Sequence, residues 1–356
     1  MSQATLEALD LTGGFAPEMD LIDPAPPKGD PTWRESVSMW LFDDAGVIQF
    51  PRFLIEDVPQ EPDRRVVFYN IAFPDGRAVV EWGHDAPAPT LDEAGKPTIY
   101  GSKAMQFRCI EPFKRWTASL RSPMTVTTNR QLMTAVPEGP RVDVEFDAET
   151  TSVVPPWISG RFNPAVARMI AEGGQDSHFM GVGFRYEQLV LAKGRCRIGE
   201  DTYEFSGRGL RVHRRSRRNT VGFRGHVWAT TVFPSGKAFG VLAYPPEKAG
   251  AAHFWEAFYF DGAVMHPAEM GGPIPWLTRA VPGPQDVSFS LRVGGREVLV
   301  GAEIQATNFS VARAAHSNRA DPMLQQQSCA RYVMEGEAAF GMMERSYPGS
   351  RITLVT

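Results

Sequence analysis

Short turns interrupt this chain so often that they leave little room for anything except β-strands. Between the turns, aromatic and β-branched residues alternate with polar ones, which is the period-two pattern of half-buried strands. The pattern recurs over residues 35–56, 64–82, 104–120, 185–209, 225–244, 253–266, 286–304 and 329–347. Strands joined by short turns at this density predict an all-β protein built from barrels or sandwiches, not from alternating strands and helices.

Two β-rich halves are expected, because 356 residues exceed the usual size of one domain. The best helical pattern covers residues 162–174, where Asn163 can cap the helix and Pro164 can occupy its first position. This short helix lies between the halves. We therefore expect one or two short helices in all, an extended segment over residues 1–30, a first β domain over 31–180 and a second over 181–356.

The two halves share one hairpin pattern. Phe-Pro-Asp-Gly at residues 73–76 and Phe-Pro-Ser-Gly at residues 233–236 both stand at the centre of an aromatic-rich alternation. Proline presets the backbone for a turn and glycine tolerates the left-handed conformation that such turns need. The pattern predicts a tight hairpin in each half.

Composition excludes several classes of protein. A formal net charge of -4 argues against a general nucleic-acid binder. Cys109, Cys196 and Cys329 are odd in number and far apart, which fits neither a disulfide framework nor the ligand spacing of a structural zinc site. The N-terminus lacks the apolar stretch of a signal peptide, and no run approaches the roughly 20 apolar residues of a membrane helix. We expect a cytoplasmic protein with no metal, no cofactor, no nucleic-acid partner and no integral membrane segment.

Positive charge is concentrated between Tyr203 and Phe239, a segment that holds seven arginines, two histidines and one tryptophan. No Asp or Glu occurs between Phe205 and Pro246. Clustered positive charge is costly unless a carboxylate from elsewhere in the fold, or an anionic ligand, compensates it. A functional site is therefore expected here.

Three short runs in this region carry a resemblance: Tyr186-Glu187-Gln188, the run from Gly207 to His213, and His226-Val227-Trp228. They resemble the central region of the carotenoid hydratase (hydroxyneurosporene synthase) and AttH-like superfamily. The resemblance implies two lipocalin-like β domains packed together, with a hydrophobic ligand in a barrel or in the cleft between them. The chain departs from the superfamily's Gly-x-Gly-x-Arg-Asp-His-Ser-Trp-Gly run, since Val212 replaces the Asp and Arg214-Arg215-Ser216 replaces Ser-Trp-Gly.

The residues of these runs suggest roles in acid and base chemistry. In an extended segment Arg211, His213 and Arg215 share one face, although we expect the run to leave the sheet after His213 because neither face is apolar. Arg211 is suited to hold a carboxylate or enolate oxygen and His213 to move a proton. Alternatively, the arginines pair with nearby acids such as Glu187, Glu200 and Glu204, or remain solvated.

Glu187 is a candidate acid or base opposite His213, or else a buried salt-bridge partner of Arg211 or Arg208. His226 and Trp228 are two residues apart and should share a strand face, where the histidine is a further proton-transfer candidate beside a flat aromatic wall. The remaining candidates for contact with a substrate are Tyr186, Trp82, His84 and Arg215.

We therefore expect a cofactor-independent enzyme of the lyase or isomerase type, such as a hydratase, dehydratase or cyclase. Its substrate would be a hydrophobic isoprenoid, polyketide or aromatic molecule, with a carboxylate or phenolate as a plausible anchor. This reaction class is implied by the resemblance together with the lack of cofactor motifs. The alternative is a non-catalytic carrier of a hydrophobic ligand, which needs shape but no converging titratable groups. A homodimer is left open.

Overall fold

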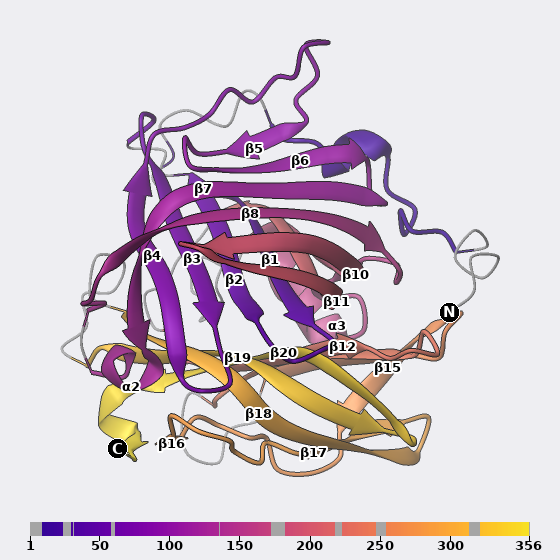
Figure 1. Ribbon diagram of the computed structural model, residues 1–356. Coiled ribbons are helices and arrows are strands. Elements are labelled where there is room, and N and C mark those ends of the chain that lie inside the picture. Colours follow the sequence, from indigo (N-terminus) through magenta and orange to yellow (C-terminus); the bar gives the residue numbers. More distant parts are fainter. Residues whose placement is uncertain are drawn as a thin grey trace.

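The computed structural model describes residues 9–23, 30, 32–57, 61–134, 136–171, 182–217, 223–246, 254–312 and 321–355. Over these residues the protein is almost entirely β-structure, which confirms the all-β prediction (Figure 1). The helical elements of the described part are η1 (Pro17–Asp20), α2 (Asn129–Leu132), α3 (Pro164–Ala171) and η2 (Gly349–Arg351). None of these helices is long and apolar enough to cross a bilayer.

The first sheet has the strand order β4-β3-β2-β1-β11-β10-β8-β7-β6-β5, and β4 also pairs with β7, so that the sheet closes on itself. A further short strand, β9, pairs with β10. The strands are β1 (Trp33–Asp43), β2 (Gln49–Asp57), β3 (Arg65–Ala72), β4 (Arg77–Asp85), β5 (Ile99–Gly101), β6 (Met105–Glu111), β7 (Arg115–Thr128), β8 (Arg141–Ser152), β9 (Trp157–Ile158), β10 (Val182–Ile198) and β11 (Asp201–Arg217).

The second sheet is a closed barrel of the order β12-β13-β14-β15-β17-β18-β19-β20, which lies below the first sheet in Figure 1. Its strands are β12 (His226–Val232), β13 (Ala238–Tyr244), β14 (Phe254–Phe260), β15 (Met265–Met270), β17 (Phe289–Val293), β18 (Arg296–Ala312), β19 (Met323–Met334) and β20 (Glu337–Pro348). Two short strands, β16 (Arg279–Ala280) and β21 (Thr353–Leu354), pair in parallel beside it.

The expected boundary near residue 180 lies outside the described residues, so the domain limits stay a prediction. Strand pairing nevertheless shows where the chain changes sheets. The long hairpin of β10 and β11 belongs to the first sheet, because β11 is paired with β1 along one edge and with β10 along the other. The second barrel begins with β12 at His226. Arg211 and His213 therefore lie in the first sheet.

Several local predictions are confirmed. The two Phe-Pro-x-Gly turns join β3 to β4 and β12 to β13, and each is closed by a hydrogen bond from the Phe N–H, to Arg77 O at 3.0 Å and to Lys237 O at 2.7 Å. Gly76 and Gly236 have φ values of 86° and 95°, in the left-handed region. Asn163 Oδ1 accepts a hydrogen bond from the Ala165 N–H at the start of α3. The expected end of this helix at Gly173-Gly174 lies outside the described residues.

The prediction that the chain leaves the sheet after His213 is wrong, since β11 continues to Arg217. Both of its edges remain paired to that point, so every backbone group has a partner. The arginines of this stretch find polar partners in other segments: Arg217 pairs with Asp30 at 2.7 Å, and Arg215 lies 3.7 Å from Glu35.

The outer face of the first sheet packs against the outer face of the second barrel. We call this contact the seam; its apolar core includes Trp40, Leu210, Val212, Trp228 and Phe258. Trp40 and Trp228 meet edge to face with ring centroids 5.0 Å apart. Val212, which stands where the superfamily run has Asp, is buried here. An apolar side chain at position 212 thus contributes to packing the two sheets together.

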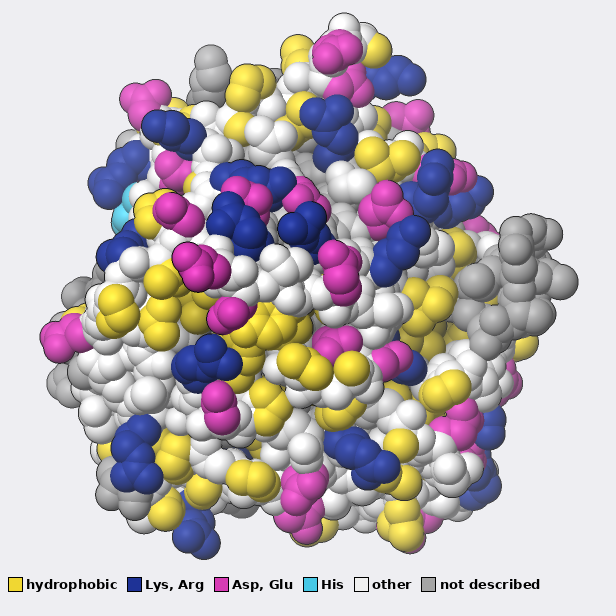
Figure 2. Space-filling view, in the orientation of Figure 1, with side chains coloured by type: hydrophobic (Ala, Val, Ile, Leu, Met, Phe, Trp, Pro, Cys, Tyr) yellow, Lys and Arg dark blue, Asp and Glu magenta, His cyan; other side chains and the backbone are white. Residues whose placement is uncertain are grey.

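The face of the first sheet that is turned to the viewer in Figure 2 carries side chains of both charges side by side. Ion pairs between neighbouring strands account for this mixture, among them Arg121 with Asp147 and Arg197 with Glu145. The arginines of these outer strands therefore do not build a continuous basic surface on that face.

Gly209 should not tolerate a side chain. A Cβ atom at this position would lie 2.1 Å from the carbonyl oxygen of Trp40 on the paired strand β1. We expect Gly209→Ala to lower the free energy of unfolding by about 2 kcal/mol or more, measured by urea titration. Gly301→Ala in β18 is the matched control, because its Cβ would meet nothing closer than 3.7 Å. Equal stability of the two variants would contradict the close approach of β1 and β11.

Candidate functional site

Successive residues of β10 and β11 face opposite sides of the first sheet, and this divides the predicted site residues into two groups. Tyr186 is paired with His213 on the inner side, whereas Glu187 is paired with Val212 on the seam side. Glu187 and His213 therefore do not face each other, and the expectation that they form an acid–base pair is wrong. We describe the inner group as the Arg211 cluster and the seam group as the seam triad, which consists of Arg185, Glu187 and Glu256.

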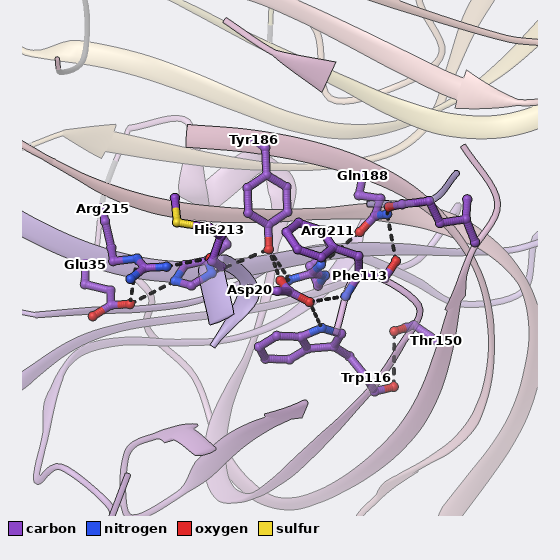
Figure 3. Close-up of polar contacts among 12 residues, drawn as sticks. Asp20, Glu35, Phe113, Trp116, Thr150, Tyr186, Gln188, Arg211, His213 and Arg215 are labelled. Atoms are coloured by element: carbon purple, nitrogen blue, oxygen red, sulfur yellow. Dashed lines mark hydrogen bonds and ion pairs between the residues drawn. The ribbon is translucent and has the colours of Figure 1, made fainter. Parts of the chain in front are cut away.

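The Arg211 cluster is built around a fully buried guanidinium group (Figure 3). Arg211 NH1 donates to Asp20 Oδ1 at 2.8 Å and to the Tyr186 hydroxyl at 2.9 Å. Arg211 NH2 donates to Gln188 Oε1 at 2.9 Å, and the guanidinium carbon lies 4.4 Å from the centre of the Trp116 ring. Planar stacking and fork-like donation are typical of structural arginine sites as well as of ligand sites.

Asp20 supplies the negative charge that pairs with Arg211 on the inner side of the first sheet. It lies at the end of η1 in the N-terminal segment and is fully buried. Its carboxylate also accepts hydrogen bonds from Trp116 Nε1 at 2.9 Å, from the Phe113 N–H and from the Tyr186 hydroxyl. The partner of Arg211 is therefore neither Glu187 nor another nearby acid of the sequence, because Asp20 is 191 positions away and still lies closest.

The N-terminal segment seals one end of the first sheet. Leu11 and Ile22 are buried, and Gln188 Nε2 donates to the Leu11 carbonyl at 3.0 Å. Arg215 NH2 donates to the Met19 carbonyl at 2.5 Å, so this predicted substrate contact is occupied by the chain itself. An extended segment was expected over residues 1–30; its described part instead anchors the cluster.

His213 and Glu35 form a second buried pair within the cluster. His213 Nε2 lies 2.9 Å from Glu35 Oε1, and both side chains are fully buried. Burial lowers the pKa of His213 to about 3, with the nearby Arg215 as a further cause. Burial also raises the pKa of Glu35 to about 8, against the opposing effect of Arg215. Near neutral pH the two groups share a hydrogen bond with both uncharged, so His213 is not poised to exchange protons at that pH.

The seam triad has a different character. Arg185 NH2 lies 2.6 Å from Glu187 Oε1, and Trp228 Nε1 donates to Glu187 Oε2 at 2.8 Å. The Arg185 guanidinium also lies 4.8 Å from the centre of the Trp228 ring. The predicted salt bridge of Glu187 is thus real, but its partner is Arg185 and not Arg211 or Arg208; Arg208 pairs with Asp44 at 2.7 Å.

Glu256, on β14 of the second barrel, is the other buried carboxyl of the triad. Its two oxygens accept hydrogen bonds from the Gly160 N–H at 2.7 Å and the Phe162 N–H at 3.1 Å. Burial raises the pKa of Glu187 and of Glu256, and the proximity of Glu256 raises that of Glu187 further. Arg185 pairs with Glu187 and only weakly opposes the rise in the pKa of Glu256, and the nearness of the two buried carboxyl groups favours keeping at least one of them protonated.

Open space adjoins Glu256, whereas the crevice beside Glu187 is too narrow to admit a water molecule in this structure. Glu187 borders a narrow apolar crevice of the seam, lined also by Trp157, Leu189, Leu210 and Phe258. Glu256 borders a pocket of about 350 Å³ beside the start of α3, with Phe162, Pro267 and Ala268 in its wall. A pocket of this volume is in the range of small-molecule sites.

The other predicted residues lie elsewhere. His226 and Trp228 share the seam face of β12, as expected, but His226 is held by Glu344 at 3.1 Å and by Ser346 Oγ at 2.8 Å. Burial opposes the charge of Glu344, yet Arg52 and His226 lower its pKa to about 2. Trp82 donates to Asn70 at 2.7 Å and stacks on Phe68, whereas His84 is exposed. Of these residues only Trp228 contacts the seam triad, through Glu187 and Arg185; no contact of His226, Trp82 or His84 with the triad is found in the described part of the chain.

Four residues of these two groups had no sequence signal: Asp20, Glu35, Arg185 and Glu256. Asp20 ends the short helix η1 and the other three lie in ordinary strands, and only the packing of distant segments brings them to the site. Among the described residues, no group of three or more His, Cys, Asp or Glu side chains is placed to hold a metal ion.

The fold defined here, a closed first sheet packed on an eight-stranded barrel, recurs in known proteins. The chain belongs to the family described as Domain of unknown function (DUF7064), whose model matches residues 19–346. The structure is similar to that of the AttH-like protein NE1406 of Nitrosomonas europaea, with a TM-score of 0.55 and 12% identity over 92% of this chain and 98% of that one.

A second solved structure, CghA with Sch210972, has a TM-score of 0.51 and 10% identity over 96% of this chain and 97% of that one. At these identities the likeness shows a shared fold, in line with the resemblance to AttH-like proteins. Among curated proteins, none matches the sequence.

Removing the Asp20 carboxylate should destabilise the protein strongly. Asp20→Ala leaves the Arg211 guanidinium buried without its counter-charge, which costs about 3–5 kcal/mol of the free energy of unfolding. Glu18→Ala, at an exposed position of the same short helix, should change it by less than about 0.5 kcal/mol. Chemical denaturation of the two variants beside the wild type measures the difference.

The Glu35–His213 pair should make stability depend on pH. The pKa of Glu35 is raised from 4.5 to about 8, so its contribution is full below pH 4.5 and is lost as pH rises toward 8. His213, whose pKa is lowered from 6.5 to about 3, acts in the opposite direction, and its contribution is lost as pH falls below 6.5. The two effects oppose each other between pH 4.5 and 6.5, so Glu35→Gln should flatten the decline in unfolding free energy between pH 6.5 and 8. An unchanged slope would contradict the uncharged pair.

Proposed function

We propose that this protein is a cofactor-independent enzyme that transfers protons to and from a hydrophobic small molecule bound at the seam. The reaction class is hydration, dehydration, isomerisation or cyclisation. Glu187 and Glu256 are the acid and base groups of this proposal. The observation that carries it is the presence of two neighbouring buried carboxyl groups of raised pKa, of which Glu187 is paired with Arg185 and Glu256 borders a pocket of about 350 Å³.

The chemistry follows from the surroundings of the carboxyl pair. A protonated carboxyl in an apolar site can donate its proton to an alkene carbon or an oxygen of the ligand. The carboxylate that forms is stabilised by Arg185 and by the Trp228 N–H, both of which already contact Glu187. Loss of a proton from the ligand, or from the water that adds to it, restores the acid. The same two contacts thus serve in every turnover.

The aromatic walls suit the charge that such a proton transfer creates. Trp157 and Phe258 line the crevice beside Glu187, and the faces of aromatic rings stabilise cations as well as bind apolar groups. The pocket beside Glu256 gives the pair an opening for a ligand. CghA, whose structure shares this fold, was solved with Sch210972, and this supports the proposal that a chain of this fold binds a ligand.

The proposal assigns His213, Arg211 and His226 to positioning, not to proton transfer. Each is fully enclosed by protein partners: Glu35 for His213, Asp20 for Arg211 and Glu344 for His226. The resemblance of the chain to the carotenoid hydratase and AttH-like superfamily agrees with the proposed reaction class. Position 212, where the superfamily run has Asp and this chain has Val, also faces the seam. The seam therefore keeps two carboxyl groups, those of Glu187 and Glu256, although the Asp of the motif is lost.

Turnover in deuterated buffer tests the proposal. The wild type, Glu187→Gln and Glu256→Gln are incubated with a panel of isoprenoids, polyketides and aromatic compounds, and mass spectrometry detects gain or loss of water and incorporation of deuterium. We expect conversion of at least one compound by the wild type and a loss of about 100-fold or more in each variant.

Two controls separate catalysis from carriage. Glu269→Gln changes an exposed carboxylate at the rim of the same pocket and should retain full turnover. Ligand binding, followed by thermal shift, should survive in the Glu187 and Glu256 variants. A compound that binds the wild type without being converted would instead identify a carrier, and a panel in which nothing binds would refute the hydrophobic ligand.

A further inference from the structure

Arg345 is a fully buried arginine of the second barrel. It lies on β20 two residues after Met343, which belongs to the core of the barrel, so its side chain points to the inside. Its exposed fraction is 1%. The strand neighbours are Gln326 on β19 and Val227 on β12. A charge is thus placed among the apolar side chains that fill the barrel.

All hydrogen-bond partners of Arg345 in the described part of the chain are neutral. Nε and NH2 donate to Gln326 Oε1 at 3.1 and 2.5 Å, NH2 also donates to Gln285 Oε1 at 2.6 Å, and NH1 donates to the Pro275 carbonyl at 3.3 Å. Amide and carbonyl oxygens orient the guanidinium group but do not neutralise it.

Three other arginines with little exposure, Arg211, Arg208 and Arg185, differ from Arg345 because each is paired with an acid. Arg211 has Asp20 at 2.8 Å, Arg208 has Asp44 at 2.7 Å, and Arg185 has Glu187 at 2.6 Å. The protein therefore recruits a carboxylate to each of these guanidinium groups, in the first case from 191 positions away. Among the described residues no acid does the same for Arg345, and an unpaired charge removed from water is expensive.

A second donor beside Arg345 also lacks a partner. Gln326 is fully buried, and while its Oε1 accepts from Arg345, its Nε2 makes no hydrogen bond. On the other side of Arg345, the side chains of Val227 on β12 and of its paired residue Ala243 on β13 offer no polar group. A guanidinium group without a counter-charge and an unpaired amide N–H beside it together form a donor set that suits a carboxylate.

We propose that the second barrel holds a carboxylate-bearing ligand whose two oxygens accept hydrogen bonds from Arg345 NH1 and Gln326 Nε2. The rest of the ligand is apolar, because Val227 on the paired strand and Met343 two residues earlier on β20 both belong to the apolar core of the barrel. This site is separate from the seam triad. Arg345 is paired with Val227 and faces the inside of the barrel, whereas its neighbour Glu344 is paired with Trp228 and faces the seam.

The segment between β15 and β17 covers the site. Pro275 and Gln285 both belong to it and both contact Arg345. The Pro275 contact at 3.3 Å is the longest of the four and involves NH1. A ligand carboxylate on NH1 replaces this weak bond with a charge-assisted one. Within the proposal, this exchange of partners on NH1 is the change that binding makes in the covering segment.

Matched acids and alcohols test the proposal on the wild-type protein. Unfolding temperature is measured at constant ionic strength with benzoate, hexanoate and octanoate, and with benzyl alcohol, hexanol and octanol as uncharged counterparts. We expect a saturable rise with the carboxylates and little change with the alcohols. If no carboxylate stabilises the protein more than its own alcohol does, the proposal is wrong.

Two arginine variants identify the responsible cation. Arg345→Met should weaken the binding of the stabilising acid by about tenfold or more, because a charged hydrogen-bond donor is lost. Arg331→Met, on the exposed side of the neighbouring strand β19, should leave binding unchanged. Isothermal titration measures both. Equal binding by Arg345→Met and the wild type would place the carboxylate elsewhere and overturn the assignment.

The same substitutions distinguish a ligand site from an internal structural bond in the absence of added acid. Arg211→Met leaves the Asp20 carboxylate buried and unpaired, and its unfolding temperature should fall well below that of the wild type. Arg345→Met breaks no ion pair, and its unfolding temperature should equal or exceed the wild-type value. A fall as large as that of Arg211→Met would show that Arg345 serves stability, and would refute the proposal.

Discussion

The ion pair between Arg211 and Asp20 is the interaction on which the first sheet depends. Strand β11 carries a run of basic residues through the middle of a closed sheet, paired on both edges. Such a strand can be buried only if its charges meet acids, and the N-terminal segment delivers the acid for Arg211. Tyr186 and Trp116 donate to the two carboxylate oxygens of Asp20, so neither oxygen is left without a donor. Gln188 accepts a further hydrogen bond from Arg211.

The alternation of side chains along β10 and β11 separates structure from chemistry. On the inner side, His213 and Arg211 are enclosed and their charges are compensated or suppressed. On the seam side, Glu187 lies next to an apolar crevice and pairs with Arg185, and Glu256 from the other sheet lies close enough to raise the pKa of Glu187. The β10–β11 pair thus contributes to both the Arg211 cluster and the seam triad. A shift of register by one residue would turn the residues of each group to the opposite side of the sheet.

The seam exists because both sheets expose an apolar face. Val212, Trp40 and Leu210 of the first sheet pack on Trp228 and Phe258 of the barrel. A carboxyl group in that setting keeps its proton more readily than one in water. Burial, which binds the two sheets together, therefore also sets the protonation of the groups proposed to act there. Inside the barrel the same burial makes the unpaired charge of Arg345 costly.

The sequence by itself determined the strands, the two Phe-Pro-x-Gly hairpins, the shared face of His226 and Trp228, and the region in which charged groups gather. These follow from periodicity and turn chemistry, which act over a few residues. Only the tertiary structure decided which groups meet. Asp20 reaches Arg211 across 191 positions, and Glu187 turns away from His213 because strand register sets the direction of every side chain. No local pattern encodes such pairings, since they arise when distant segments are packed together and each buried charge must find a partner.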